Sequence, residues 1–132
     1  MPLARSELLA AARDARDRAY APYSGFRVGA ALATDDGEIV TGANVENASY
    51  PLAMCAERSA LFAAVSRGAR KFVALGLVGP PGVEIAPCGA CRQSLAEFGS
   101  ELIVVREGRE DVTLGALLPD PFGSEMLREP AG

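Results

Sequence analysis

The residues of this chain best suited to chemistry are three cysteines, Cys55, Cys88 and Cys91, which are its only ones. Cys88 and Cys91 are three residues apart, so on the first turn of a helix both sulfurs face the same side. Such a pair can chelate a metal ion, and a helix N-terminus favours the thiolate over the thiol. A lone Cys-x-x-Cys also occurs in redox dithiols and in structural zinc sites, so the pair alone leaves these alternatives open.

Cys55 supplies a third sulfur, and Glu57 follows it by two residues. Three protein ligands with one open position are typical of catalytic zinc, whereas four ligands are typical of structural zinc. Residues two apart on a regular helix point to nearly opposite sides, so Glu57 can approach the metal only if Cys55 lies at or before the helix start. Glu57 would then flank the open position and take a proton from water there. The ordinary alternatives are a small buried Cys55 and a solvated Glu57 in a first helical turn.

Arg58 follows Cys55 by three residues, and we expect it to donate hydrogen bonds to the sulfurs. Zinc with three thiolates carries a net charge of about −1, which a nearby guanidinium would offset. The alternative is an ordinary surface arginine. The chain contains no histidine, which excludes a Ser-His-Asp triad, a Cys-His pair and a His-ligated metal. Acid–base chemistry near neutral pH must therefore come from a carboxylate, Cys, Lys or Tyr.

Length and composition limit the class of protein. A chain of 132 residues with 49% apolar content predicts a single domain over residues 1–132, with a short flexible tail from about residue 124. The net charge of −4 argues against a nucleic acid polymer as partner. The sequence has no apolar run of the roughly 20 residues that span a bilayer and no signal pattern at its start, so we expect no membrane partner and a cytoplasmic location.

Hydrophobic periodicity and turn signals predict the elements that must position these residues. The small residues Gly29, Ala30 and Ala31 indicate a strand on which a helix lies closely. The order predicts an α/β fold, a three-layer α/β/α sandwich with a mixed central sheet of about five strands. The expected elements are a helix over 3–19, strands over 26–34 and 38–42 joined by a hairpin turn at 35–37, a helix over 55–67, a strand over 72–79, a helix over 87–99, a strand over 102–105, an edge strand over 109–113 and a helical turn over 114–118.

Several ordered blocks of this sequence resemble the small, homotetrameric-type zinc-dependent cytidine deaminases. The match runs from about Tyr20 to Phe122 and rests on Tyr23–Ala31, Asn44–Tyr50, Cys55–Arg58 and Pro87–Gln93. The resemblance implies hydrolysis of cytidine and 2′-deoxycytidine to uridine and 2′-deoxyuridine with release of ammonia, in pyrimidine salvage. It also implies that Cys55, Cys88 and Cys91 hold one Zn²⁺ per subunit, with Glu57 as the proton carrier.

The same resemblance implies a set of substrate contacts. Asn44 and Glu46 would hydrogen-bond the sugar 3′-hydroxyl, although without the resemblance both could be turn formers. Phe26 would stack near the pyrimidine, and the backbone of Ala56 would bind the ring. Phe122 would reach the site of a neighbouring subunit in a homotetramer.

One departure and three rivals accompany this interpretation. Pro51 stands where the family usually carries Gly, and it fixes the backbone just ahead of Cys55. One rival is a deaminase of a related aminopyrimidine nucleoside of the blasticidin type. Another is a non-catalytic zinc or redox module that uses Cys88 and Cys91 and has no use for Glu57. Editing of RNA or DNA is disfavoured by the acidic charge balance.

Overall fold

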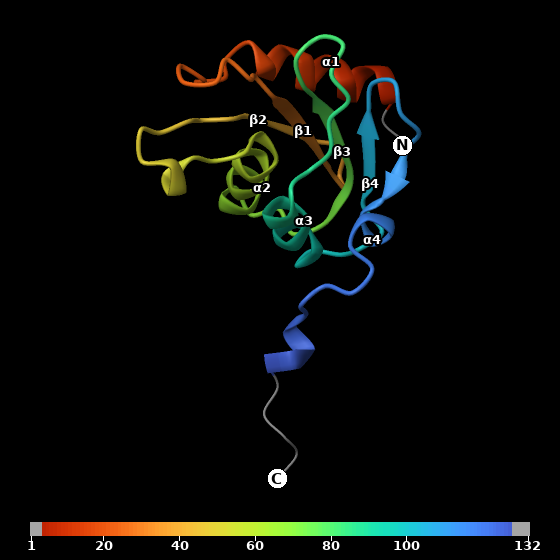
Figure 1. Cartoon of the computed structure of the whole chain (residues 1–132). Helices are drawn as coiled ribbons and strands as arrows, with labels where there is room; N and C mark the ends of the chain where they lie inside the picture. Colours follow the sequence, from red (N-terminus) through yellow and green to blue (C-terminus); the bar gives the residue numbers. More distant parts are fainter. Residues whose placement is uncertain (1–3, 128–132) are drawn as a thin grey trace.

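A mixed five-stranded sheet forms the centre of the molecule (Figure 1). The computed structural model describes residues 4–127. The strand order is β2-β1-β3-β4-β5, with β3 parallel to β4 and all other neighbours antiparallel. The strands are β1 (Gly29–Thr34), β2 (Ile39–Ala43), β3 (Phe72–Val78), β4 (Ile103–Arg106) and β5 (Val112–Thr113).

Helices cover both faces of this sheet, which confirms the predicted three-layer α/β/α sandwich. Figure 1 shows α1 on one side of the strands, and α2 and α3 on the other. Helix α3 lies in the connection between the parallel strands β3 and β4, as a parallel crossover requires. The helices are α1 (Arg5–Arg16), α2 (Ala56–Ser66), α3 (Gly89–Ala96) and α4 (Leu114–Leu117), with short 3₁₀ helices at Tyr50–Leu52 and Ser124–Leu127.

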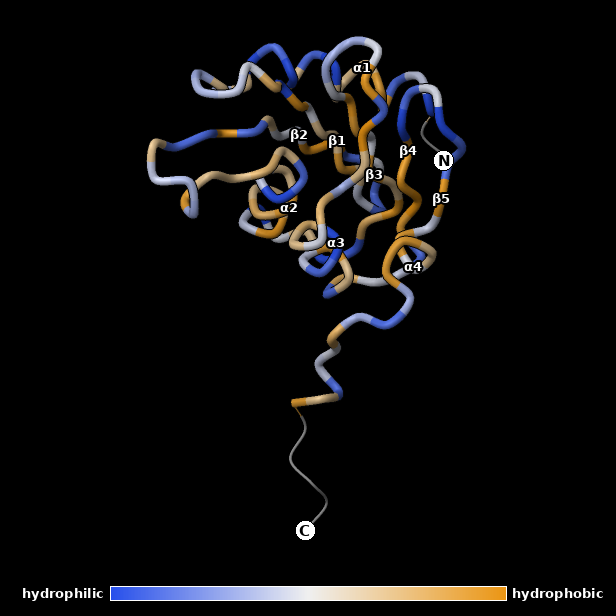
Figure 2. The backbone as a smooth tube through the Cα atoms, in the orientation of Figure 1, coloured by the Kyte–Doolittle hydropathy of each residue, from blue (hydrophilic) through white to orange (hydrophobic). Residues whose placement is uncertain are grey.

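Strand β1 is buried on both faces, because side chains alternate across a strand and each set meets a helical layer. Ala30 and Leu32 belong to the core cluster under α2, whereas Ala31 and Ala33 belong to the cluster under α1. A strand covered on both faces reads as a continuous apolar run. Figure 2 shows this as hydrophobic colour along the central strands, in contrast to the hydrophilic connecting loops.

Two glycines let a helix approach the sheet backbone on each face. A Cβ on Gly29 would overlap the Ala12 carbonyl oxygen of α1. A Cβ on Gly42 would overlap the Ala60 backbone nitrogen and lie 2.7 Å from the Ala56 carbonyl oxygen of α2. The predicted close helix packing at Gly29 is thus confirmed. The Gly42 contact fixes the first turn of α2, where the candidate site residues lie.

The predicted elements are present, and their ends differ for local reasons. The hairpin turn at 35–37 is confirmed by the pairing of Ala33 with Ile39. The strand expected from Phe26 begins only at Gly29, because the Asn44 side chain bonds the Phe26 carbonyl and the Val28 amide in place of a partner strand.

The predicted first helix begins at Arg5, and its expected start at residue 3 lies outside the described residues. The predicted tail begins with the 3₁₀ helix at Ser124–Leu127, and residues 128–132 also lie outside the described part. Within residues 4–127, no helix combines the length and apolarity needed to cross a bilayer.

We predict that Gly42→Ala destabilises the fold and displaces the start of α2. Backbone atoms cannot move aside as a flexible side chain can, so the free energy of unfolding should fall by about 3 kcal/mol or more. Chemical denaturation measures this loss, and zinc content of the folded fraction reports the displaced helix. Gly29→Ala is the matched control on the α1 face: it should lower stability by a similar amount and leave zinc content intact. Equal zinc content in both variants would contradict the predicted link between Gly42 and the site.

Candidate active site and metal centre

The folded chain brings its three sulfurs together at the N-termini of two helices. Cys55 is the residue before α2 and Cys88 the residue before α3, while Cys91 lies in the first turn of α3. The Cys88 and Cys91 sulfurs are 3.4 Å apart, and the Cys55 and Cys88 sulfurs are 3.8 Å apart. All three lie within 4.8 Å of one another. The predicted condition that Cys55 precede the helix is met.

This sulfur cluster has the spacing that a tetrahedral ion demands. Zn–S bonds of about 2.3 Å at tetrahedral angles place sulfurs roughly 3.8 Å apart. Cys91 is buried, Cys55 is half-buried and Cys88 is exposed, so the cluster is closed on one side and reachable on the other. No histidine exists in the chain and no fourth cysteine can complete the set. The donor set therefore fits a zinc ion with three thiolate ligands and an open position.

Glu57 lies beside the sulfurs, in the second position of α2, and is only 5% exposed. Burial raises the pKa of its carboxyl from 4.5 to about 7, and the neighbouring Cys55 adds to the rise. A carboxyl with a pKa near neutrality can both accept and donate a proton at physiological pH. Glu57 thus has the property that a group carrying protons in both directions needs.

Arg58 donates from Nη2 to the Cys55 sulfur over 3.6 Å, as its spacing predicted. The hydrogen bond with Cys91, followed by that from Arg58, lowers the pKa of Cys55 below its ordinary value. The same contact with Cys55 raises the pKa of Cys91. The arrangement favours negative charge on sulfur at the entrance of α2, where the helix dipole acts in the same direction.

A pocket of about 480 Å³ opens beside Glu57 and the Cys55 and Cys88 sulfurs. The loop between β2 and α2 and the loop before α3 form its walls. Of the substrate contacts that the resemblance implies, four lie in the lining, namely Phe26, Asn44, Glu46 and Ala56. The pocket volume suits a ligand of nucleoside size.

Asn44 and Glu46 are also the residues that hold the Phe26 wall in place. Asn44 accepts a hydrogen bond from the Val28 amide and donates one to the Phe26 carbonyl, both at 2.8 Å. Glu46 accepts from the backbone amides of Tyr23 and Ser24 at 3.0 and 3.1 Å, and from the Ser24 hydroxyl. The Ser24 hydrogen bond lowers the pKa of Glu46 below its ordinary value.

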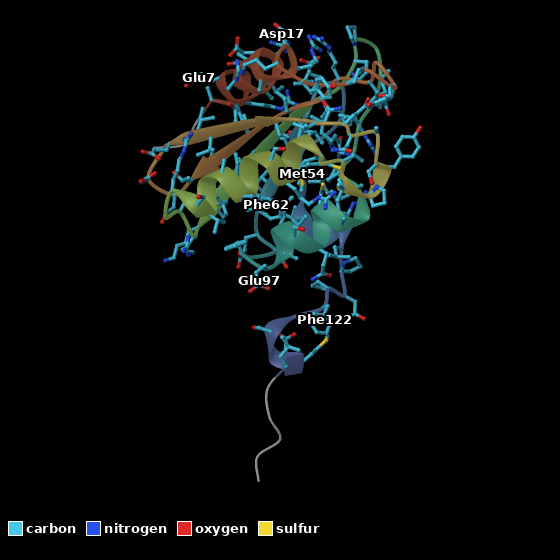
Figure 3. The ribbon with its side chains drawn as sticks, turned by 90° about the vertical axis from the view of Figure 1, so that its left-hand side faces the viewer. Glu7, Asp17, Met54, Phe62, Glu97 and Phe122 are labelled. Carbon is cyan, nitrogen blue, oxygen red and sulfur yellow. The ribbon has the colours of Figure 1, made fainter. Side chains whose placement is uncertain are left out.

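Phe122 does not line this pocket. The residue is 55% exposed, and Figure 3 shows it on the extension toward the C-terminus, well apart from Met54, which precedes Cys55. The Gln93 side chain accepts from the Phe122 amide at 3.2 Å and donates to its carbonyl at 2.8 Å. These two bonds fix the backbone of Phe122 while its ring points to solvent.

Sequence reasoning missed several residues of the lining. Met54 pairs with Val45 through two backbone hydrogen bonds of 2.9 Å, which tie the loop after β2 to the first sulfur ligand. Glu84 and Ile85 come from the loop ahead of α3. Their only signal in the sequence is that they lie shortly before Pro87-Cys88, where the chain must reach the site.

Comparison with known proteins identifies the family. The family model described as the cytidine and deoxycytidylate deaminase zinc-binding region matches residues 4–107, which include all three cysteines. The chain belongs to the cytidine deaminase family. Its sulfur cluster accordingly fits one zinc ion per chain, so the predicted cofactor is confirmed.

Several cytidine deaminases are similar to this family member along most of its length. A cytidine deaminase of Sporosarcina psychrophila is 46% identical over 126 residues, which cover 92% of this chain and 93% of that protein. The crystal structure of cytidine deaminase from Mycobacterium tuberculosis has a TM-score of 0.86 at 46% identity, covering 92% of this chain and 99% of that one. The corresponding structure from Burkholderia pseudomallei has a TM-score of 0.82 at 47% identity, covering 91% and 100%. These matches confirm the predicted family and fold.

We predict that Glu57→Gln stabilises the metal-free protein at alkaline pH and not at acid pH. Below about pH 4.5 the carboxyl is neutral in the folded and the unfolded chain. Between pH 4.5 and about 7 the carboxyl ionises only in the unfolded chain, so stability falls as pH rises. Above pH 7 the folded chain carries the full cost of burying the ionised carboxylate. The free energy of unfolding of the variant at pH 8 should therefore exceed that of the wild type by on the order of 3 kcal/mol. Urea denaturation with a chelator at pH 4.5 and pH 8 measures the difference, and an equal gain at both pH values would contradict the prediction.

Proposed function

We propose that this chain catalyses the hydrolytic deamination of cytidine and 2′-deoxycytidine to uridine and 2′-deoxyuridine, with release of ammonia. The observation that carries the proposal is a buried carboxyl, Glu57, in the same pocket as three sulfurs that fit a zinc ion with an open position. Membership of the cytidine deaminase family supports the same reaction.

In this proposal Cys55, Cys88 and Cys91 hold zinc, which supplies a Lewis acid that makes water nucleophilic near neutral pH. Glu57 accepts a proton from the water that attacks C4 of the pyrimidine and delivers it to N3. Glu57 next takes the proton of the hydroxyl now on C4 and passes it to the amino group. The C4–N bond then breaks, ammonia leaves, and the oxygen on C4 becomes the carbonyl of the product. One carboxyl serves as base and acid, which a pKa near 7 allows. Arg58 would offset the charge of the thiolates from behind Cys55.

The substrate contacts are further parts of the proposal. Phe26 stacks near the pyrimidine, and the Ala56 amide binds the ring, since the first N–H groups of a helix have no partner within it. Asn44 retains one lone pair and one N–H beyond its two backbone bonds, and one Glu46 oxygen retains a lone pair. These remaining groups can bind the 3′-hydroxyl, which favours a nucleoside over the free base.

We also propose that residues 1–132 act as one domain in a homotetramer that works in cytoplasmic pyrimidine salvage. The fixed backbone and exposed ring of Phe122 support its role as a contact to the site of a neighbouring subunit. A nucleoside, rather than a nucleic acid or a membrane, is the partner that this chemistry selects.

The rival functions explain less of the pocket. A structural zinc or redox module requires the sulfurs and has no role for a buried Glu57 beside them. A blasticidin-type deaminase shares the reaction but not the relatives, which are cytidine deaminases along nearly the whole chain.

We predict that Glu57→Ala retains zinc and loses at least about a thousandfold of the cytidine deaminase rate, because one group serves both proton transfers. Zinc content by metal analysis and the ultraviolet change on incubation with cytidine measure the two properties. Cys91→Ser is the contrasting variant, which should lose zinc and activity together. Equal turnover by wild type and Glu57→Ala would remove Glu57 from the mechanism, and absence of zinc in active protein would overturn the metal site.

A separate prediction concerns assembly. In non-denaturing buffer the protein should have about four times the mass of one chain. Phe122→Ala should raise KM for cytidine by about tenfold or more while retaining the tetramer, since loss of an aromatic contact removes roughly 1–3 kcal/mol of binding. Native mass spectrometry and steady-state kinetics test both statements. A monomer with full activity would contradict them.

A further inference from the structure

The charged residues that line the pocket are all acidic. Three carboxylates line it, Glu46, Glu57 and Glu84, and among the described lining residues there is no lysine or arginine. A site that binds phosphate ordinarily presents guanidinium groups, ammonium groups or a helix N-terminus to it. The two helix N-termini at this pocket, those of α2 and α3, carry the sulfur cluster. The charge of the lining therefore has a consequence for which nucleosides can enter.

The three carboxylates differ in burial and in how many hydrogen bonds and ion pairs already offset their negative charge. Glu57 is buried at the closed end beside the sulfurs. Glu46 accepts hydrogen bonds from two backbone amides and the Ser24 hydroxyl, which take up much of its negative charge. Glu84 has a side chain that is 72% exposed, and its Oε2 lies 3.9 Å from Arg109 Nε. Glu84 is thus the solvent-exposed carboxylate among the three that line the pocket.

We propose that Glu84 is a specificity-determining residue that disfavours nucleoside 5′-monophosphates relative to the uncharged nucleoside. The inference rests on the proposed function, because the reacting amino group must lie at the closed end beside Glu57. A phosphate carried by the sugar then lies toward the mouth. A pocket of this volume is no wider than the Debye length of about 10 Å at 0.1 M salt. Salt therefore does not fully screen the repulsion between Glu84 and a phosphate anywhere at the pocket opening.

Coulomb's law gives the expected size of the effect of Glu84 on phosphate binding. A dianionic phosphate roughly 8 Å from one carboxylate in water is disfavoured about fivefold at low salt. Reversing the charge doubles the interaction, which corresponds to about 25-fold. Arg109 partly offsets Glu84 and does not line the pocket, so its removal should change selectivity in the opposite direction.

The test compares inhibition by cytidine 5′-monophosphate with the KM for cytidine in a set of variants. Relative to KM for cytidine, the inhibition constant should fall about fivefold in Glu84→Gln and about 25-fold in Glu84→Lys at about 20 mM salt. It should rise severalfold in Arg109→Gln. These differences should shrink at about 0.5 M NaCl, where exposed charges are screened. Glu97→Gln, which makes the same change in net charge away from the pocket lining, should leave the ratio unchanged.

An unchanged ratio in both Glu84 variants, or an equal change in Glu97→Gln, would overturn the role of Glu84. Calorimetric binding of cytidine and its 5′-monophosphate to zinc-loaded Glu84 variants that also carry Glu57→Ala measures the same discrimination without turnover. Failure of wild type to deaminate cytidine would contradict the proposed function, and the calorimetric ratios would still decide the question of Glu84.

Discussion

The concentration of negative charge at one corner of the molecule is the constraint on which the rest of the structure depends. Three sulfurs lie within 4.8 Å of one another beside the buried Glu57. Ionising all four groups without compensation would cost more free energy than the net stability of a domain of this size. The N-termini of α2 and α3 lie at the cluster, and Arg58 donates a hydrogen bond to the Cys55 sulfur. A divalent ion supplies the compensation that remains, so metal binding and stability of this corner are coupled.

The N-termini of α2 and α3 can stabilise this cluster only if the sheet holds both helices in fixed positions. Helix α2 is fixed by its contact with Gly42 on β2, and α3 is fixed by the crossover between the parallel strands β3 and β4. Cys55 and Cys88 each take the extended conformation of the residue before a helix. Their sulfurs therefore lie outside the helical turns and can face each other, which residues inside the helices could not do as easily.

The sequence predicted the part of the site that is local, and it could not predict the part that depends on long-range packing. Cys88, Cys91, Glu57 and Arg58 stand in fixed relation to a helix start, so their spacing alone indicated how they would point. The family resemblance, by contrast, was needed to connect Asn44 and Phe26 with the same pocket. For Glu84 the sequence offered only its closeness to Pro87-Cys88, because its place in the pocket lining depends on how the loop after β3 folds back over the site.

Asn44 and Glu46 show why the two interpretations of polar loop residues are not exclusive. Each was expected either to form a turn or to bind a sugar, and in the structure each already holds the backbone that carries Phe26. A side chain with several hydrogen-bonding atoms can use some for the loop and leave others for a ligand. Binding a hydroxyl to the remaining atoms would then tighten the same network that positions the aromatic wall. One hydrogen-bond network in such a pocket both binds the sugar hydroxyl and positions Phe26 against the pyrimidine, so the two interactions are coupled.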